Sequence, residues 1–200
     1  MKRVLLILPN GFEILEAAAF IDVLGWADDC GDTPIEVVKA GVSKHLRCTF
    51  GGFDFVPDFT LAELDFATFD AVAIPGGFET AGFYEEASSE PVKLALQRFD
   101  ERVAPIASIC VGALAVANAG ILCGRRATTY ALDGGKWRSR LAQFGADVLN
   151  QEIVVDENII TSANPQTAVH VAFELLEKLS SRANADHVRF QMGFPKIGPQ

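Results

Sequence analysis

The most informative stretch of the sequence is Val103-Ala-Pro-Ile-Ala-Ser-Ile-Cys-Val-Gly-Ala-Leu-Ala-Val-Ala-Asn118. Its first half is a short apolar run typical of a buried strand, and its second half is a run of small residues that favours a helix. Cys110 therefore lies on a sharp turn between the two. Because helix N-terminal N–H groups favour an anion, we expect a lowered thiol pKa and a reactive thiolate. The alternative is a buried cysteine that acts only as a small hydrophobe.

The segments on both sides of this stretch alternate between strand-like and helix-like patterns. This alternation predicts an α/β sandwich whose mostly parallel sheet is covered by helices on both faces. We expect a single domain over residues 1–181, and a less regular C-terminal tail over 182–200 that packs on the domain or on a partner subunit. The predicted strands are 3–8, 35–39, 71–74 and 103–109, with short strands in 45–59 and a hairpin in 152–161; the predicted helices are 14–28, 92–99, 134–144 and 168–179.

Composition excludes several classes of function. The chain has 200 residues and a net charge of −9, which disfavours nucleic acid and anionic membrane surfaces as partners. No apolar run reaches the ~18 residues of a membrane span. The four cysteines form no C-x-x-C pair and the three histidines are scattered, so we expect no metal site and no cofactor. Without a secretion signal, free thiols indicate a cytoplasmic protein.

Three loops follow the carboxyl ends of predicted strands, where open α/β sheets bind ligands. They are 9–16, 75–80 and 110–112, and we expect them to converge. Glu16 lies among apolar neighbours, so its carboxyl should be protonated and could donate a hydrogen bond to a thiolate. Gly76 and Gly77, with the N–H of Val111, could form an oxyanion hole. The simpler interpretations are a helix N-terminal carboxylate and an ordinary tight turn.

The surroundings of Cys110 are less well defined by the sequence. Phe12 and Phe78 flank the proposed loops and could make the pocket apolar, and Tyr130 ends a short strand that could approach it. A cysteine hydrolase normally needs a histidine base. None of the three histidines follows from the layout as a partner for Cys110, and tyrosine is a poor base at neutral pH.

Taken together, five motifs resemble the ThiJ/PfpI superfamily, which has the class I glutamine amidotransferase-like fold. The resemblance implies a flavodoxin-like three-layer sandwich, a nucleophile elbow and a homodimer. It implies that Cys110 is the reactive cysteine, that Glu16 is the protonated glutamate bonded to its sulfur, and that Gly76, Gly77 and Val111 supply backbone donors. The motifs are Gly11-Phe-Glu-Ile-Leu-Glu16, Ala73-Ile-Pro-Gly-Gly77, Ala107-Ser-Ile-Cys-Val-Gly112, Gly124-Arg-Arg-Ala-Thr-Thr129 and Ile159-Ile-Thr-Ser-Ala-Asn-Pro165, in family order.

The chain also departs from the branches of this superfamily. The protease-like branch has histidine where Val111 stands, which argues against peptidase activity. Another branch often has histidine where Tyr130 stands, so the usual group for proton transfer is missing. The amidotransferases need a late His-Pro-Glu, and the comparable stretch here is Ala163-Asn-Pro-Gln166.

These observations lead to three functional hypotheses. The first is a stress-response enzyme with glyoxalase- or deglycase-like chemistry, in which the Cys110 thiolate attacks a reactive carbonyl and Glu16 moves the proton. The second is a cysteine-oxidation sensor or stress chaperone without turnover. The third is a hydrolase of a small amide or nitrile-type substrate, with a water-activating group that the sequence does not identify.

Overall fold

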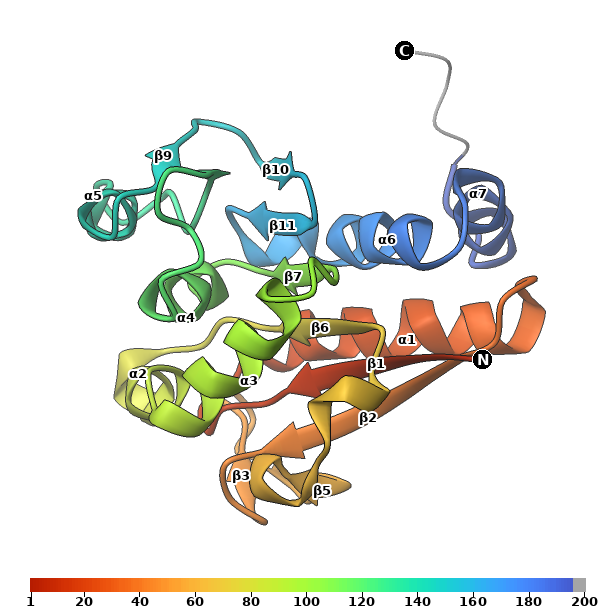
Figure 1. Ribbon diagram of the computed structural model, residues 1–200, viewed down its shortest axis with the longest axis horizontal. Helices are drawn as coiled ribbons and strands as arrows, with labels where there is room; N and C mark the ends of the chain where they lie inside the picture. The colour runs from red at the N-terminus through yellow and green to blue at the C-terminus, as the bar shows by residue number, and fades with distance from the viewer. Residues whose placement is uncertain (196–200) are drawn as a thin grey trace.

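A seven-stranded sheet runs through the centre of the molecule in the order β10-β11-β7-β6-β1-β2-β5 (Figure 1). The structure is a computed structural model and describes residues 1–195. All neighbours in the sheet are parallel except the antiparallel pair β10 and β11. The strands are β1 (Lys2–Ile7), β2 (Ile35–Gly41), β5 (Phe59–Thr60), β6 (Ala71–Ile74), β7 (Ile106–Ser108), β10 (Ile153–Asp156) and β11 (Ile159–Ser162).

Helices cover both faces of the sheet, which confirms the predicted sandwich (Figure 1). α1, α6 and α7 pack together on one face, and α2, α3 and α4 lie on the other. β1, β6 and β7 are buried almost throughout, as expected for strands covered on both sides. The helices are α1 (Ile14–Cys30), α2 (Phe83–Ala87), α3 (Glu90–Asp100), α4 (Gly112–Asn118), α5 (Lys136–Gln143), α6 (Ala168–Leu179) and α7 (Arg182–Gln191).

Short elements connect this framework. The region 45–59 forms an antiparallel hairpin of β3 and β4, as predicted, and β8 pairs in parallel with β9 outside the main sheet. These strands are β3 (Leu46–Arg47), β4 (Asp54–Phe55), β8 (Arg126–Ala127) and β9 (Asp147–Val148), and the single 3-10 turns are η1 (Leu61–Glu63), η2 (Phe66–Thr68), η3 (Glu79–Ala81) and η4 (Pro165–Thr167).

The prediction of a less regular tail after residue 181 is wrong for residues 182–191. They form α7, whose Ser181 cap accepts a hydrogen bond from the backbone N–H of Asn184. Val188 is buried, and the helix packs against α1 and α6, so this part of the chain belongs to the domain. Residues 196–200 of the expected tail lie outside the described residues.

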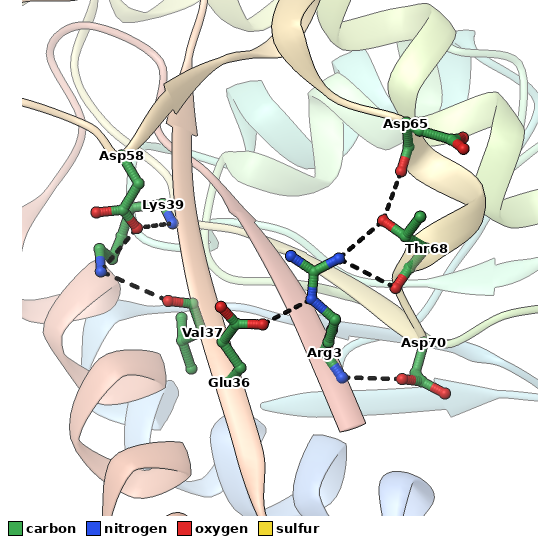
Figure 2. Close-up of polar contacts among 8 residues, drawn as sticks. All are labelled: Arg3, Glu36, Val37, Lys39, Asp58, Asp65, Thr68 and Asp70. Atoms are coloured by element: carbon green, nitrogen blue, oxygen red, sulfur yellow. Dashed lines mark hydrogen bonds and ion pairs between the residues drawn. The ribbon is translucent and has the colours of Figure 1, made fainter. Parts of the chain in front are cut away.

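Polar contacts fix the amino ends of β1 and β6 (Figure 2). The backbone N–H of Arg3 donates to Asp70, which directly precedes β6, at 2.8 Å. The Arg3 guanidinium pairs with Glu36 on β2 at 2.6 Å. These contacts join the amino ends of β1, β2 and β6, at the opposite end of the strands from the loops that follow them.

Candidate functional site

The loops after β1, β6 and β7 meet at one edge of the sheet, because these three strands are neighbours. Cys110 lies in the turn between β7 and α4, as the sequence predicts. Its φ angle is +54°, in the left-handed region that non-glycine residues rarely adopt. The Thr129 hydroxyl donates to the Cys110 carbonyl at 2.9 Å and helps to hold this turn. A strained backbone at a sharp strand-to-helix turn is typical of a nucleophile elbow.

Glu16 reaches this turn from the first turn of α1. Its side chain is fully buried, with 0% exposure, and its Oε2 accepts a hydrogen bond from the N–H of Gly76 at 2.5 Å. No nitrogen or oxygen within residues 1–195 forms a hydrogen bond with its Oε1. The Cys110 thiol interacts with the same carboxyl group. Cys110 and Glu16 lie 94 positions apart in the sequence. The structure brings these two predicted site residues into contact.

Burial raises the pKa of Glu16 to about 8, and the nearby charge of Glu13 adds to this effect. The hydrogen bonds from Gly76 and Cys110 act in the opposite direction but do not outweigh burial. The Glu16 carboxyl is therefore protonated at neutral pH, which agrees with the expectation from its apolar neighbours.

The expectation of a lowered pKa at Cys110 is wrong. The thiol is only 6% exposed, and burial raises its pKa, as do the carboxyl groups of Glu16 and Glu13. The N–H of Val111 bonds to the sulfur and lowers the pKa, so the expected effect of the helix start is present. The effect of the Val111 N–H is outweighed because burial removes the hydration of the thiolate and the two carboxyl groups repel its charge.

The backbone N–H groups predicted to form an oxyanion hole do not all face the cavity. The N–H of Gly76 is taken by Glu16, so its expected role in an oxyanion hole is wrong. The N–H of Val111 points to the Cys110 sulfur. Gly77 lies on the wall of the cavity described next, and a Cβ there would come within 2.3 Å of the Gly11 carbonyl oxygen. Glycine is required at residue 77 because the two loops approach so closely.

An open cavity of about 560 Å³ lies in front of Cys110. Aromatic side chains line much of it, including the predicted Phe78 and Tyr130. Phe12 does not line it. This ring packs edge-on against Phe55, with centroids 6.0 Å apart, and borders a separate apolar cavity next to α1. The expectation that Phe12 belongs to the pocket is wrong because its side chain points to the other side of its loop.

Two large aromatic residues of the cavity were not anticipated from the sequence. Tyr84 of α2 stacks on Trp137 of α5, with ring centroids 4.9 Å apart and an interplanar angle of 15°. Trp137 is far from the elbow in sequence, and its local pattern indicates only a helix. The structure also places Glu13, the N-cap residue of α1, on the cavity wall.

The described residues place neither a histidine nor a group of metal ligands at this edge. None of the three histidines lines the cavity in residues 1–195. The same residues contain no group of three potential ligands placed to hold a metal ion. In this part of the chain, no helix combines the length and the apolar character needed to cross a membrane.

The family is decided by a match to the model of the DJ-1/PfpI family over residues 2–178. The chain belongs to the DJ-1/PfpI family. This confirms the resemblance to the ThiJ/PfpI superfamily. The crystal structure of Drosophila melanogaster DJ-1beta superimposes with a TM-score of 0.84 at 27% identity, covering 97% of this chain and 98% of that one. The flavodoxin-like fold expected from the resemblance is therefore confirmed.

Three relatives in this family extend the comparison. Protein DJ-1 homolog A of Arabidopsis thaliana is 30% identical over 94% of this chain, which spans 45% of that relative's length. Glutathione-independent glyoxalase DJR-1.2 of Caenorhabditis elegans is 27% identical over 89% of both chains. Deglycase PfpI of Pyrococcus furiosus is 31% identical over 65% of this chain and 74% of its own length.

Proposed function

We propose that this DJ-1/PfpI family protein is a cysteine-dependent enzyme with glyoxalase- or deglycase-like chemistry on reactive carbonyl compounds. The observation that carries the proposal is the pairing of Cys110, on a left-handed turn, with the buried carboxyl of Glu16 beside an open cavity. Relatives named as a glyoxalase and a deglycase support the same class of substrate. Peptidase activity is not proposed, because Val111 stands where a histidine base would be needed.

The reaction begins from the singly protonated Cys110–Glu16 pair, whose proton can lie on either group. With the proton on Glu16, the Cys110 thiolate attacks the aldehyde carbon, a C–S bond forms, and the carbonyl electron pair moves to oxygen. The oxygen takes the Glu16 proton, which gives a neutral hemithioacetal. The N–H of Gly77 stabilises the developing oxyanion, and the N–H of Val111, which bonds the sulfur in the resting site, joins it once the C–S bond has formed and the sulfur no longer carries charge.

Glu16, now a carboxylate, then removes the proton from the first carbon of an α-oxoaldehyde and returns it to the second carbon. This transfer converts the hemithioacetal to a thioester without an external oxidant. Water hydrolyses the thioester, releasing a 2-hydroxy acid and the Cys110 thiol. Tyr130 lines the cavity and can orient the substrate, but its phenol is a poor base at neutral pH.

We further propose that the protein acts as a cytoplasmic homodimer in the response to carbonyl stress. Apolar side chains of α1 and the β3–β4 hairpin support the dimer. Ile14 and Phe53 are exposed beside an apolar groove of about 270 Å³ between these elements. Exposed apolar patches of this kind usually mark an interface.

The oxidation-sensor hypothesis has weaker support. A sensor cysteine is usually exposed and has a low pKa, whereas Cys110 is buried and its pKa is raised. The hypothesis predicts that mild peroxide oxidises Cys110 before the exposed Cys123. Peptide mass spectrometry that finds Cys123 oxidised first would reject it.

The proposed function is tested by methylglyoxal consumption with purified protein. We expect Cys110→Ser to reduce the rate to that of a blank, and Glu16→Gln to reduce it roughly 100-fold or more, because proton transfer contributes this much in enzymes. Cys123→Ser is the matched control, since Cys123 is exposed and lies outside the cavity. Full activity of the Cys110→Ser variant would overturn the proposal.

A further inference from the structure

The cavity in front of Cys110 has an unusual distribution of charge. Three carboxyl groups line it, those of Glu13, Glu79 and Asp133, against one cation, Lys136. Within residues 1–195, none of the three carboxyl groups forms an ion pair or a side-chain hydrogen bond. Among the described lining residues the carboxyl groups therefore outnumber the cations three to one, and burial raises the pKa of Glu13, so Glu79 and Asp133 contribute most of the negative charge.

Glu13 is the most informative of these groups. Its side chain is only 9% exposed, it lines the cavity, and it has no polar side-chain partner in the described part of the chain. A carboxyl group this buried is normally hydrogen-bonded or paired. Its carboxyl group faces the cavity, so a cation that enters can pair with it and favour its charged form.

The aromatic wall has the same preference. Tyr84 and Trp137 stack face to face, and the Lys136 ammonium lies over the Trp137 ring, 4.4 Å from its centroid. Aromatic faces attract cations through their quadrupole, and this ring already holds one from the protein. The Trp137 ring is thus already occupied by Tyr84 and Lys136, and the carboxyl groups beside it are the part of the wall that can bind an ammonium or guanidinium group.

The size of the cavity agrees with a substrate larger than methylglyoxal. Its volume of about 560 Å³ lies within the range of sites for drug-sized ligands, roughly 300–1,000 Å³. Methylglyoxal has only five non-hydrogen atoms and no charge. It would contact Cys110 and leave Glu79, Asp133 and the Trp137 side of the cavity unused.

Resting on the proposed function, we infer that the preferred substrate is a carbonyl compound with a cationic amino or guanidinium group. Its electrophilic carbon meets Cys110, and its cation lies among the carboxyl groups of Glu13, Glu79 and Asp133. Lys136 limits the affinity for the cation, because it lies on the same wall.

The test measures how the charge of a thiol reagent affects the rate at which it modifies Cys110, and it does not depend on turnover. Trimethylammonioethyl, hydroxyethyl and sulfonatoethyl methanethiosulfonates present a cation, a neutral group and an anion on the same reactive unit. In each case the thiolate forms a disulfide and expels methanesulfinate. Modification of the Cys110 peptide is followed by mass spectrometry at low ionic strength, and each rate is divided by that for free cysteine.

We expect the cationic reagent to react with Cys110 roughly tenfold or more faster than the anionic one, with the neutral reagent between them. Added salt should reduce this preference. Glu13→Gln should lower the ratio of cationic to neutral rates about threefold, and the double variant Glu79→Gln/Asp133→Asn should lower it similarly. Lys136→Met should raise it. The ratio cancels any change in thiolate fraction that these variants cause.

Asp29→Asn is the matched control, because Asp29 lies at the far end of α1 and does not line the cavity. An equal or faster reaction with the anionic reagent would overturn the inference and leave the carbonyl chemistry standing. A ratio that Glu13→Gln and the double variant leave unchanged would also overturn it. No reaction of Cys110 with the neutral reagent would overturn the proposed function together with the inference.

Discussion

At the scale of single residues, the site is governed by the burial of two neighbouring groups whose titrations are coupled. Glu16 has a pKa near 8, and the pKa of Cys110 is raised by burial and by the neighbouring carboxyl groups. The pair therefore holds two protons at neutral pH and loses the first near pH 8. Only the state with one proton can present a thiolate beside a protonated carboxyl group.

This coupling predicts the pH dependence of the thiol. Alkylation of Cys110 by neutral iodoacetamide should accelerate as the pH rises through about 8, because the pair loses its first proton there. In Glu16→Gln the step near pH 8 should disappear, since glutamine does not titrate. Rates measured from pH 5 to pH 10 by peptide mass spectrometry check this. Full reactivity at pH 6 would show a thiol of low pKa and contradict it.

Glu16 should also make stability depend on pH. Its pKa is about 8 in the folded protein and 4.5 as the reference for the unfolded chain, so folding favours the protonated form. The resulting stabilisation is fully present below pH 4.5 and is lost as the pH rises through 8. Glutamine resembles the neutral carboxyl group and does not titrate. We expect the stability of Glu16→Gln relative to wild type to rise by up to about 1.4 kcal/mol per pH unit over this window.

Denaturant unfolding at several pH values measures this difference. Glu90→Gln is the control, because Glu90 is exposed on α3 and should show no such trend. A difference between Glu16→Gln and wild type that stays constant from pH 4.5 to 8 would mean that the Glu16 carboxyl titrates normally.

At the scale of elements, close contacts between loops and helices hold the elbow in place. α4 begins at Gly112, where a Cβ would come within 2.8 Å of the Pro75 carbonyl oxygen. Gly31 at the end of α1 shows a similar constraint. Its φ is −79°, so the left-handed cap that a glycine at this point suggests is absent. A Cβ there would instead meet the Ala27 carbonyl oxygen at 2.5 Å.

A pair of glycine variants separates close packing from helix propensity. Gly112→Ala should destabilise the protein by about 1–3 kcal/mol, because α4 would have to move away from the loop after β6. Gly25→Ala should stabilise it by about 1 kcal/mol, since Gly25 lies within α1 with no atom within 4 Å of the added Cβ. Chemical denaturation measures both. Equal effects of the two substitutions would contradict the assigned contact.

At the scale of the whole molecule, the face formed by the start of α1 and the β3–β4 hairpin exposes large apolar side chains. Phe53 is 64% exposed beside the groove between α1 and the β3–β4 hairpin, and Ile14 and Leu15 are exposed at the start of α1. The net charge of −9 opposes association of two copies, so a dimer would depend on burying these side chains.

The proposed dimer should therefore depend on Phe53. Phe53→Asp should convert it to a monomer, because a carboxylate would be buried without a partner at the interface. Leu94→Asp is the control, since Leu94 is equally apolar but exposed on α3, on the other face of the sheet. Light scattering after size-exclusion chromatography measures the mass. A wild-type monomer at micromolar concentration would reject the dimer.

The sequence by itself determined the sandwich, the order of its main elements, and Cys110 and Glu16 as a candidate pair. These are local properties, since periodicity and turn residues act within a few positions. Only the tertiary structure decided the rest. It commits the N–H of Gly76 to Glu16, turns Phe12 away, raises the pKa of Cys110 and stacks Tyr84 on Trp137. Burial and contacts between distant segments determine these features, because pKa values and cavity walls depend on neighbours that no local pattern specifies.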